Sequence, residues 1–107
     1  NLVAGNEFGE VLAELERLMP AFRRDPANRN TLGEVRRAFH TLKGSGRMVG
    51  ALRIGEFGWA VENMLNRCLE GALAVRAPVL QAVEQAVALL PALVENFRNG
   101  AGDEDPA

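Results

Sequence analysis

Apolar residues recur at intervals of three and four along almost the whole of this 107-residue chain, and this spacing constrains the fold most. Strand signals are nearly absent, because there is no tyrosine and no alternating run of Val, Ile and Thr. The apolar stripes predict helices at about residues 6–24, 31–49, 52–70 and 77–98. The predicted fold class is therefore all-α. We expect an antiparallel up-down four-helix bundle over residues 1–99, because the connections are short.

Local signals give the expected ends of the second helix. Thr31-Leu32-Gly33-Glu34 has the spacing of a capping box and predicts a start at Asn30 or Thr31. A start at Asp25-Pro26 is the alternative, with proline as the first helical residue. Gly50 suits the left-handed conformation that commonly ends a helix, so we expect the second helix to stop there.

Two features mark the C-terminal quarter of the chain. Pro91 lies inside the fourth apolar stripe, and because the stripe continues in phase past it, we favour a kinked helix over two separate ones. Residues 100–107 are acidic and contain glycine and proline, which is typical of a linker. We therefore expect a domain taken from a longer chain.

Composition fits one folded domain, with 48% hydrophobic and 24% charged residues. The formal net charge of −2 argues against a general nucleic-acid binder. No apolar run approaches the roughly 20 residues that cross a bilayer, so we expect no membrane contact. The single cysteine fits, weakly, a reducing cytoplasmic location.

The chain is poor in histidine and cysteine and lacks a nucleotide-binding loop. It has one histidine and one cysteine, Cys68, which is too few for a typical zinc site or for an internal disulfide. Gly44-Ser45-Gly46 is followed by no Lys-Ser/Thr pair and does not match a P-loop. We expect Cys68 in the core and no metal, cofactor or ATP bound by the chain itself.

Two glycines lie inside the second predicted helix, where each costs about 1 kcal/mol relative to alanine. Gly46 falls on the core stripe, so it can allow another helix to pack closely. Gly44 does not, and it lies four residues after His40 on the same helix face. A glycine there removes bulk next to the imidazole, which suits close approach by another molecule.

His40 lies one residue off the buried stripe, at the edge of the helix face, with cations on its side of the helix. Arg36, Lys43 and Arg47 share that side. A cationic surround suits a group that becomes negatively charged, and a phosphoryl group adds close to two negative charges near neutral pH. Lysine is a good point-charge partner for phosphate. An ordinary solvated face remains the alternative for Arg36 and Arg47.

Counting residues places a carboxylate at the height of His40. Gly50 follows His40 by ten residues and Glu62 follows Gly50 by twelve, so the two helical arms are about 15 and 18 Å long. If they fold back as a hairpin, Glu62 can accept a hydrogen bond from one ring nitrogen. That contact would fix the tautomer and leave the other nitrogen as a nucleophile. The alternative is a plain surface glutamate.

These residues match a known pattern. His40-Thr41-Leu42-Lys43-Gly44 resembles the His-x-x-Lys-Gly motif of histidine-containing phosphotransfer (HPt) domains. Gly50 and the segment Glu62-Asn63-Met64-Leu65 resemble the version at the N-terminus of CheA-type chemotaxis kinases. Residues 45–50 are similar to the domains arrayed in CheA-like hybrid kinases that control type IV pili. The resemblance covers the second and third helices well, whereas the fifth helix usual in CheA-type domains has little room here.

The resemblance implies a set of roles. His40 would be phosphorylated on its outer nitrogen, Lys43 would favour the phosphorylated state, Gly44 would give docking room and Glu62 would orient the ring. It also implies a donor histidine kinase domain and an acceptor receiver domain bearing an aspartate, with Mg²⁺ held only by those partners. We expect a monomeric relay domain that is not itself an enzyme, from a CheA-like sensor histidine kinase. The further docking residues predicted are Arg36, Arg47 and Gly50.

Three other functions remain open from the sequence. A helical bundle could be a pure interaction module, which a cognate kinase would not phosphorylate. An enzyme could use His40 as a general base, although so small a bundle offers little concave space. A DNA-binding helix-turn-helix could use Arg36, Arg37, Lys43 and Arg47 on phosphates, although the net charge and Gly44 speak against it.

Overall fold

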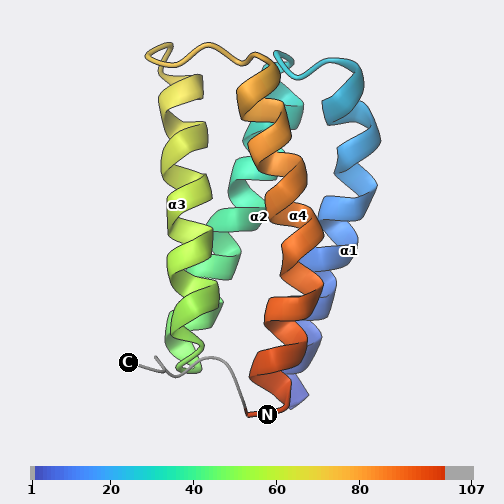
Figure 1. The fold of residues 1–107 in the computed structure, drawn as a ribbon, viewed down its shortest axis with the longest axis vertical. Coiled ribbons are helices and arrows are strands. Elements are labelled where there is room, and N and C mark those ends of the chain that lie inside the picture. The colour runs from blue at the N-terminus through green and yellow to red at the C-terminus, as the bar shows by residue number, and fades with distance from the viewer. Residues whose placement is uncertain (1, 101–107) are drawn as a thin grey trace.

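Four helices form the bundle in a computed structural model that describes the backbone of residues 2–100 and the side chains of residues 7–100. They are α1 (Leu2–Arg24), α2 (Arg29–Met48), α3 (Leu52–Leu69) and α4 (Ala77–Arg98). Each helix runs antiparallel to the one before it, up and down in turn (Figure 1). The predicted all-α, up-down four-helix fold is confirmed. Apart from Gly100, the predicted linker at 100–107 lies outside the described residues.

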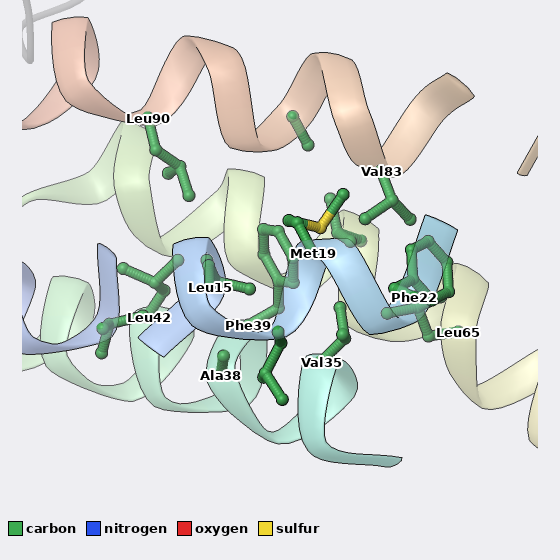
Figure 2. Packing of buried hydrophobic residues seen from close by; sticks show 14 of the residues in the cluster. Leu15, Met19, Phe22, Val35, Ala38, Phe39, Leu42, Leu65, Val83 and Leu90 are labelled. Atoms are coloured by element: carbon green, nitrogen blue, oxygen red, sulfur yellow. The ribbon is translucent and has the colours of Figure 1, made fainter. Parts of the chain in front are cut away.

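The apolar stripes of the four helices meet in one core (Figure 2). Phe8, Phe22 and Phe39 are completely buried, and Phe8 packs edge to face against Phe97 with ring centroids 6.0 Å apart. Cys68 is buried in this core, as predicted. Burying these side chains is the main favourable term for the fold, because apolar surface removed from water contributes about 25 cal/mol per Å².

The start of α2 differs from the prediction. Asn28 is the N-cap, and its side-chain oxygen accepts hydrogen bonds from the backbone amides of Asn30 (3.0 Å) and Thr31 (3.2 Å). The proposed Thr31 capping box is therefore wrong, since Thr31 is already inside the helix. Asparagine caps helices at least as well as threonine, so the earlier residue satisfies the free amides of the first turn.

The end of α2 follows the prediction closely. Gly50 has a φ of +79°, and the amides of Gly50 and Ala51 bond back to the carbonyls of Arg47 (3.3 Å) and Gly46 (2.7 Å). This pair of bonds is a Schellman motif, which needs a left-handed residue that glycine adopts without penalty. The last helical residue is Met48, one before the expected bound. α1 starts four residues before its expected bound, and α3 ends one residue before it.

Proline lies inside two helices. α4 continues as one helix through Pro91, so it is not divided there. Pro20 lies inside α1, where the sequence reading expected no interruption. Both rings are exposed. On the solvent side, a carbonyl that lacks its helical partner can bond to water instead.

α4 is also more apolar than the sequence reading allowed. By length and composition it could cross a membrane, with a hydropathy of 1.5 over its most apolar stretch. This corrects the expectation that no run approaches the necessary length. A helix in the core of a globular protein passes the same test. The inner face of α4 packs in the bundle through Val79, Val83, Ala86, Leu90 and Val94.

Three glycines bring α2 and α3 unusually close together. A Cβ on Gly46 would lie 2.7 Å from the backbone nitrogen of Gly55. A Cβ on Gly58 would lie 2.8 Å from both the nitrogen of Lys43 and the carbonyl oxygen of Phe39. Real Cβ atoms essentially never approach so closely. The packing role predicted for Gly46 is therefore confirmed, and this contact sets the distance between the two helices that carry the polar site.

Candidate functional site

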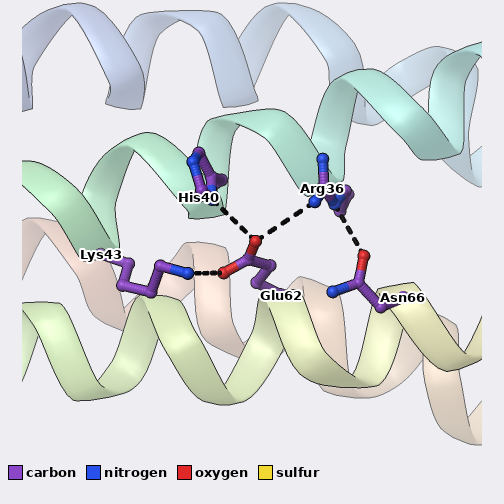
Figure 3. Close-up of polar contacts among 5 residues, drawn as sticks. All are labelled: Arg36, His40, Lys43, Glu62 and Asn66. Atoms are coloured by element: carbon purple, nitrogen blue, oxygen red, sulfur yellow. Dashed lines mark hydrogen bonds and ion pairs between the residues drawn. The ribbon is translucent and has the colours of Figure 1, made fainter.

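His40 lies in the middle of α2, on the surface that faces the solvent beside α3 (Figure 3). Its side chain is 55% exposed, as expected for a residue at the edge of the buried stripe. Phe39, its neighbour in the chain, is completely buried and anchors this turn of the helix in the core. The imidazole is therefore accessible on a firmly packed backbone.

Glu62 comes from α3 and lies at the height of His40, as the residue count predicted. Its Oε2 is 2.7 Å from Nδ1 of His40. The side chain is only 5% exposed, although it carries an ionisable group. A buried carboxylate needs compensating partners, and buried ionisable groups with charged partners cluster at functional sites.

Two cations of α2 supply that compensation. Lys43 Nζ lies 2.7 Å from Oε1 of Glu62, an ion pair whose angles fall outside those of a regular hydrogen bond. Arg36 Nη2 lies 3.4 Å from Oε2, the oxygen that also faces His40. Glu62 therefore stands between the ring and two positive charges, with all three partners on α2 (Figure 3).

Asn66 fixes the position of Arg36. It lies one turn after Glu62 on α3, and its Oδ1 accepts a hydrogen bond of 2.7 Å from Nε of Arg36. The guanidinium is thus held at the rim of the site while one of its ends reaches Glu62. Nothing in the sequence reading singled out Asn66. Its spacing of four from Glu62 is the signal that could have found it.

The charge state of Glu62 decides the tautomer of the ring. Burial raises the pKa of this carboxyl, but the contacts with Lys43 and His40 outweigh it, and the net pKa lies below the ordinary 4.5. Glu62 is therefore ionised at neutral pH and can only accept from Nδ1. In the neutral ring the proton then resides on Nδ1 and the lone pair on Nε2. Figure 3 shows that second nitrogen directed away from Glu62.

The other predicted residues lie around this centre. A Cβ on Gly44 would meet nothing within 4 Å, so the space one turn after His40 is open. Arg47 lies further along α2, and its side chain has no ion pair within residues 7–100. Gly50 lies at the end of α2, away from the ring, and its observed part is to stop the helix. The structure therefore brings together Arg36, His40, Lys43 and Glu62, but not Gly50.

Two further residues that sequence reasoning missed position the site. Gly55 and Gly58 lie on the face of α3 that meets α2, two turns and one turn before Glu62, respectively. They are glycines inside a predicted helix, which was the signal that drew attention to Gly44 and Gly46. Applied to α3, the same argument would have found them.

The part of the chain that the structure describes holds no group of three or more His, Cys, Asp or Glu side chains suited to a metal ion. Burial raises the pKa of the Cys68 thiol, which therefore stays protonated at neutral pH. Within residues 7–100, His40 and its three charged neighbours form one connected cluster of ionisable side chains.

Comparison with known proteins agrees with this geometry. The family model described as "Hpt domain" matches residues 6–100. The chemotaxis protein CheA of Treponema pallidum (strain Nichols) is 31% identical over 92% of this chain, which spans 13% of that protein. The CheA proteins of Listeria monocytogenes and Listeria innocua are each 26% identical over 88% of the chain, which spans 15% of each. No solved structure gave a significant match. The narrower resemblance to kinases that control type IV pili stays a prediction.

Proposed function

Because the chain belongs to the Hpt domain family of histidine phosphotransfer modules in two-component signalling, we propose the following mechanism for it. Domains of this family have no catalytic ATP site of their own. His40 accepts a phosphoryl group from the catalytic domain of a histidine kinase and passes it to an aspartate of a receiver domain. The chain spans only a small part of its curated relatives, so the parent protein is part of this proposal: a cytoplasmic, CheA-like sensor kinase.

The first step forms a phosphohistidine. The Nε2 lone pair attacks the γ-phosphorus of ATP held by the kinase, the N–P bond forms, and the bond to the bridging oxygen breaks so that ADP leaves. Glu62 keeps the Nδ1 proton in place and stabilises the positive charge that the ring acquires. Phosphoryl transfer depends mainly on positioning and on charge neutralisation. Mg²⁺ and the nucleotide site belong to the kinase.

The second step reverses the bond changes at His40. A carboxylate oxygen of the receiver aspartate forms a bond to phosphorus, the N–P bond breaks, and its electron pair returns to Nε2. Lys43 contacts Oε1 of Glu62 through a single ion pair. Because its side chain is flexible, its ammonium group can move from Glu62 to the phosphoryl group on the neighbouring His40. The open space beside Gly44 lets the receiver bring its aspartate close to the ring.

One observation carries this proposal. A buried, ionised Glu62 lies 2.7 Å from Nδ1 of an exposed histidine, which leaves Nε2 as a free nucleophile with cations nearby. A general-base enzyme would also need a substrate pocket. Neither main depression of the described surface has His40 in its lining.

The test uses labelled ATP, Mg²⁺ and a kinase catalytic domain from the same signalling system. Wild-type protein should become labelled, His40→Gln should not, and a receiver domain should remove the label. Because His40 is exposed, the variant should keep its helical circular dichroism. Absence of label with a kinase active on another substrate would favour a pure interaction module.

A further inference from the structure

A second glycine on α2 has no structural explanation within the chain. Gly33 lies inside the helix, and a Cβ there would meet nothing within 4 Å, as at Gly44. Its φ is not in the left-handed region. A glycine inside a helix costs about 1 kcal/mol relative to alanine, and here neither close packing nor a turn requires it. The missing side chain leaves the backbone at this position open to contact with another molecule.

Gly33 is placed to share a partner with His40. It precedes His40 by seven residues, which is about two turns and about 10 Å along the same side of the helix. A protein interface of ordinary size covers about 800 Å² on each partner, so one centred on His40 reaches Gly33. The two bare positions, Gly33 and Gly44, lie on either side of the imidazole.

Gly33 lines a surface depression of about 620 Å³ between α2 and α3. The depression borders the His40 site, because Arg36 and Asn66 belong to both. Its lining residues are Arg29, Asn30, Gly33, Glu34, Arg36, Arg37, Asn66 and Leu69.

Positive charge collects at this depression. Its lining holds three of the five cationic side chains of α2, Arg29, Arg36 and Arg37, together with the single acid of that helix. Arg29 is held in place by a 2.8 Å hydrogen bond from its Nη2 to the carbonyl of Leu69, and Arg36 is held by Asn66. The exposed Arg37 side chain has no ion pair or hydrogen bond with any other described residue. Arg29 is therefore held by an uncharged partner and Arg37 is unpaired, whereas Arg36 shares the charge of Glu62.

Glu34, the single acid of α2, lies in the same lining, so three arginines face one carboxylate there and the net charge of the lining stays positive. The pKa of Arg17 on α1 is raised, first by its contact with Glu14 and to a small extent by the nearby charge of Glu34. Glu34 therefore also interacts with the charge of Arg17 on α1.

We propose that the depression around Gly33 is a second docking point for the receiver protein, where an acidic side chain of that protein contacts Arg29 and Arg37 over the bare backbone of Gly33. This inference rests on the proposed function and names the partner surface. An acceptor that uses an aspartate and holds Mg²⁺ through carboxylates presents an acidic face around its site. That face complements the basic surface beside His40, and charge complementarity mainly sets association rate and partner choice.

The test measures binding of a receiver domain from the same signalling system to ¹⁵N-labelled 107-residue protein by NMR titration. With wild type, amide shifts should extend from His40 to residues 29–37. Arg37→Glu should weaken binding about tenfold at low salt and much less at high salt, because the contact is exposed. Gly33→Leu should weaken it several-fold by filling the depression, and Arg37→Lys should bind nearly as wild type.

Matched controls lie outside α2. Arg76→Glu reverses the same charge at the start of α4, and Gly9→Ala makes a glycine replacement on α1. Both should bind as wild type. Equal binding by Arg37→Glu, Gly33→Leu and wild type would overturn the docking point. So would equal shifts at residues 29–37 with inorganic phosphate or duplex DNA alone, which would mean a general anion site.

Labelling by the kinase separates this inference from the proposed function. Arg37→Glu and Gly33→Leu should be labelled on His40 as fast as wild type. If labelling falls while receiver binding is unchanged, the occupant is the kinase and the receiver assignment is wrong. If no protein is labelled but the variants still lose receiver binding, the docking point stands and the phosphotransfer proposal fails.

Discussion

Replacing Gly58 by alanine tests whether the close approach of α2 and α3 creates the site. The new Cβ would lie 2.8 Å from the nitrogen of Lys43 and from the carbonyl oxygen of Phe39. Both are backbone atoms of α2, so neither can rotate away. Ordinary contact begins at 3.4 Å, and reaching it from 2.8 Å requires the helices to separate by about 0.6 Å.

That separation acts directly on the polar contact. Glu62 lies one turn after Gly58, and its Oε2 is 2.7 Å from Nδ1 of His40. A rigid shift of about 0.6 Å would place these atoms about 3.3 Å apart, beyond the usual N–H···O range of about 2.7–3.2 Å. Overpacking costs about 1–3 kcal/mol. Removing a helical glycine regains about 1 kcal/mol, so the fold should survive with a net loss of at most about 2 kcal/mol.

The assay combines ¹⁵N NMR of the imidazole with the rate of phosphorylation. In wild type the Nδ1–H tautomer should dominate, whereas Gly58→Ala should show a mixture of tautomers. Losing a hydrogen bond to a charged group costs at least about 1.5 kcal/mol, which corresponds to about a tenfold slower reaction. Gly44→Ala is the matched control for the tautomer, because its Cβ meets nothing. A wild-type tautomer and rate in Gly58→Ala, with a stability gain equal to that of Gly44→Ala, would refute the reasoning.

Three further predictions concern Glu62, Gly44 and Asn28. The pKa of Glu62 is depressed in the folded state, so its stabilising contribution is present above pH 4.5 and is lost as pH falls through the folded-state value. The difference in urea-unfolding free energy between wild type and Glu62→Gln should therefore shrink on acidification, and a constant difference would contradict the assignment. Gly44→Leu should slow transfer to a receiver, measured as loss of label over time, because the new side chain fills the open space beside His40. It should raise the melting temperature slightly, because leucine favours a helix more than glycine does. An unchanged transfer rate would contradict the docking role of Gly44. Asn28→Ala should lower the unfolding free energy by about 1 kcal/mol in chemical denaturation, because two amides lose their acceptor; the same loss in Thr31→Ala with none in Asn28→Ala would restore the capping box.

The sequence predicted the fold because helix periodicity is a local property. Apolar spacing gave four helices, and short connections gave their alternating directions. Gly50 gave the end of α2, since only a left-handed residue closes that turn well. The predicted start of α2 was wrong because Asn28 and Thr31 are both good N-cap residues. The turn leading into the helix selects Asn28. Local propensity alone would have ended or bent α1 at Pro20, because proline removes a helical hydrogen bond. The helix continues through it because the apolar face of α1 packs in the bundle.

Within the site, the sequence determined height along the helices but not rotation about them. Similar counts from Gly50, ten residues back to His40 and twelve forward to Glu62, placed the two side chains at nearly the same height, because the rise per residue is fixed at about 1.5 Å. Which oxygen meets the ring, and whether Arg36 reaches the same carboxylate, depend on how α3 turns about its axis. That rotation is set by the close contact at Gly46, Gly55 and Gly58. The tertiary structure alone therefore decided that Asn66 holds Arg36 beside Glu62, because this contact joins two helices through side chains whose directions no local pattern fixes.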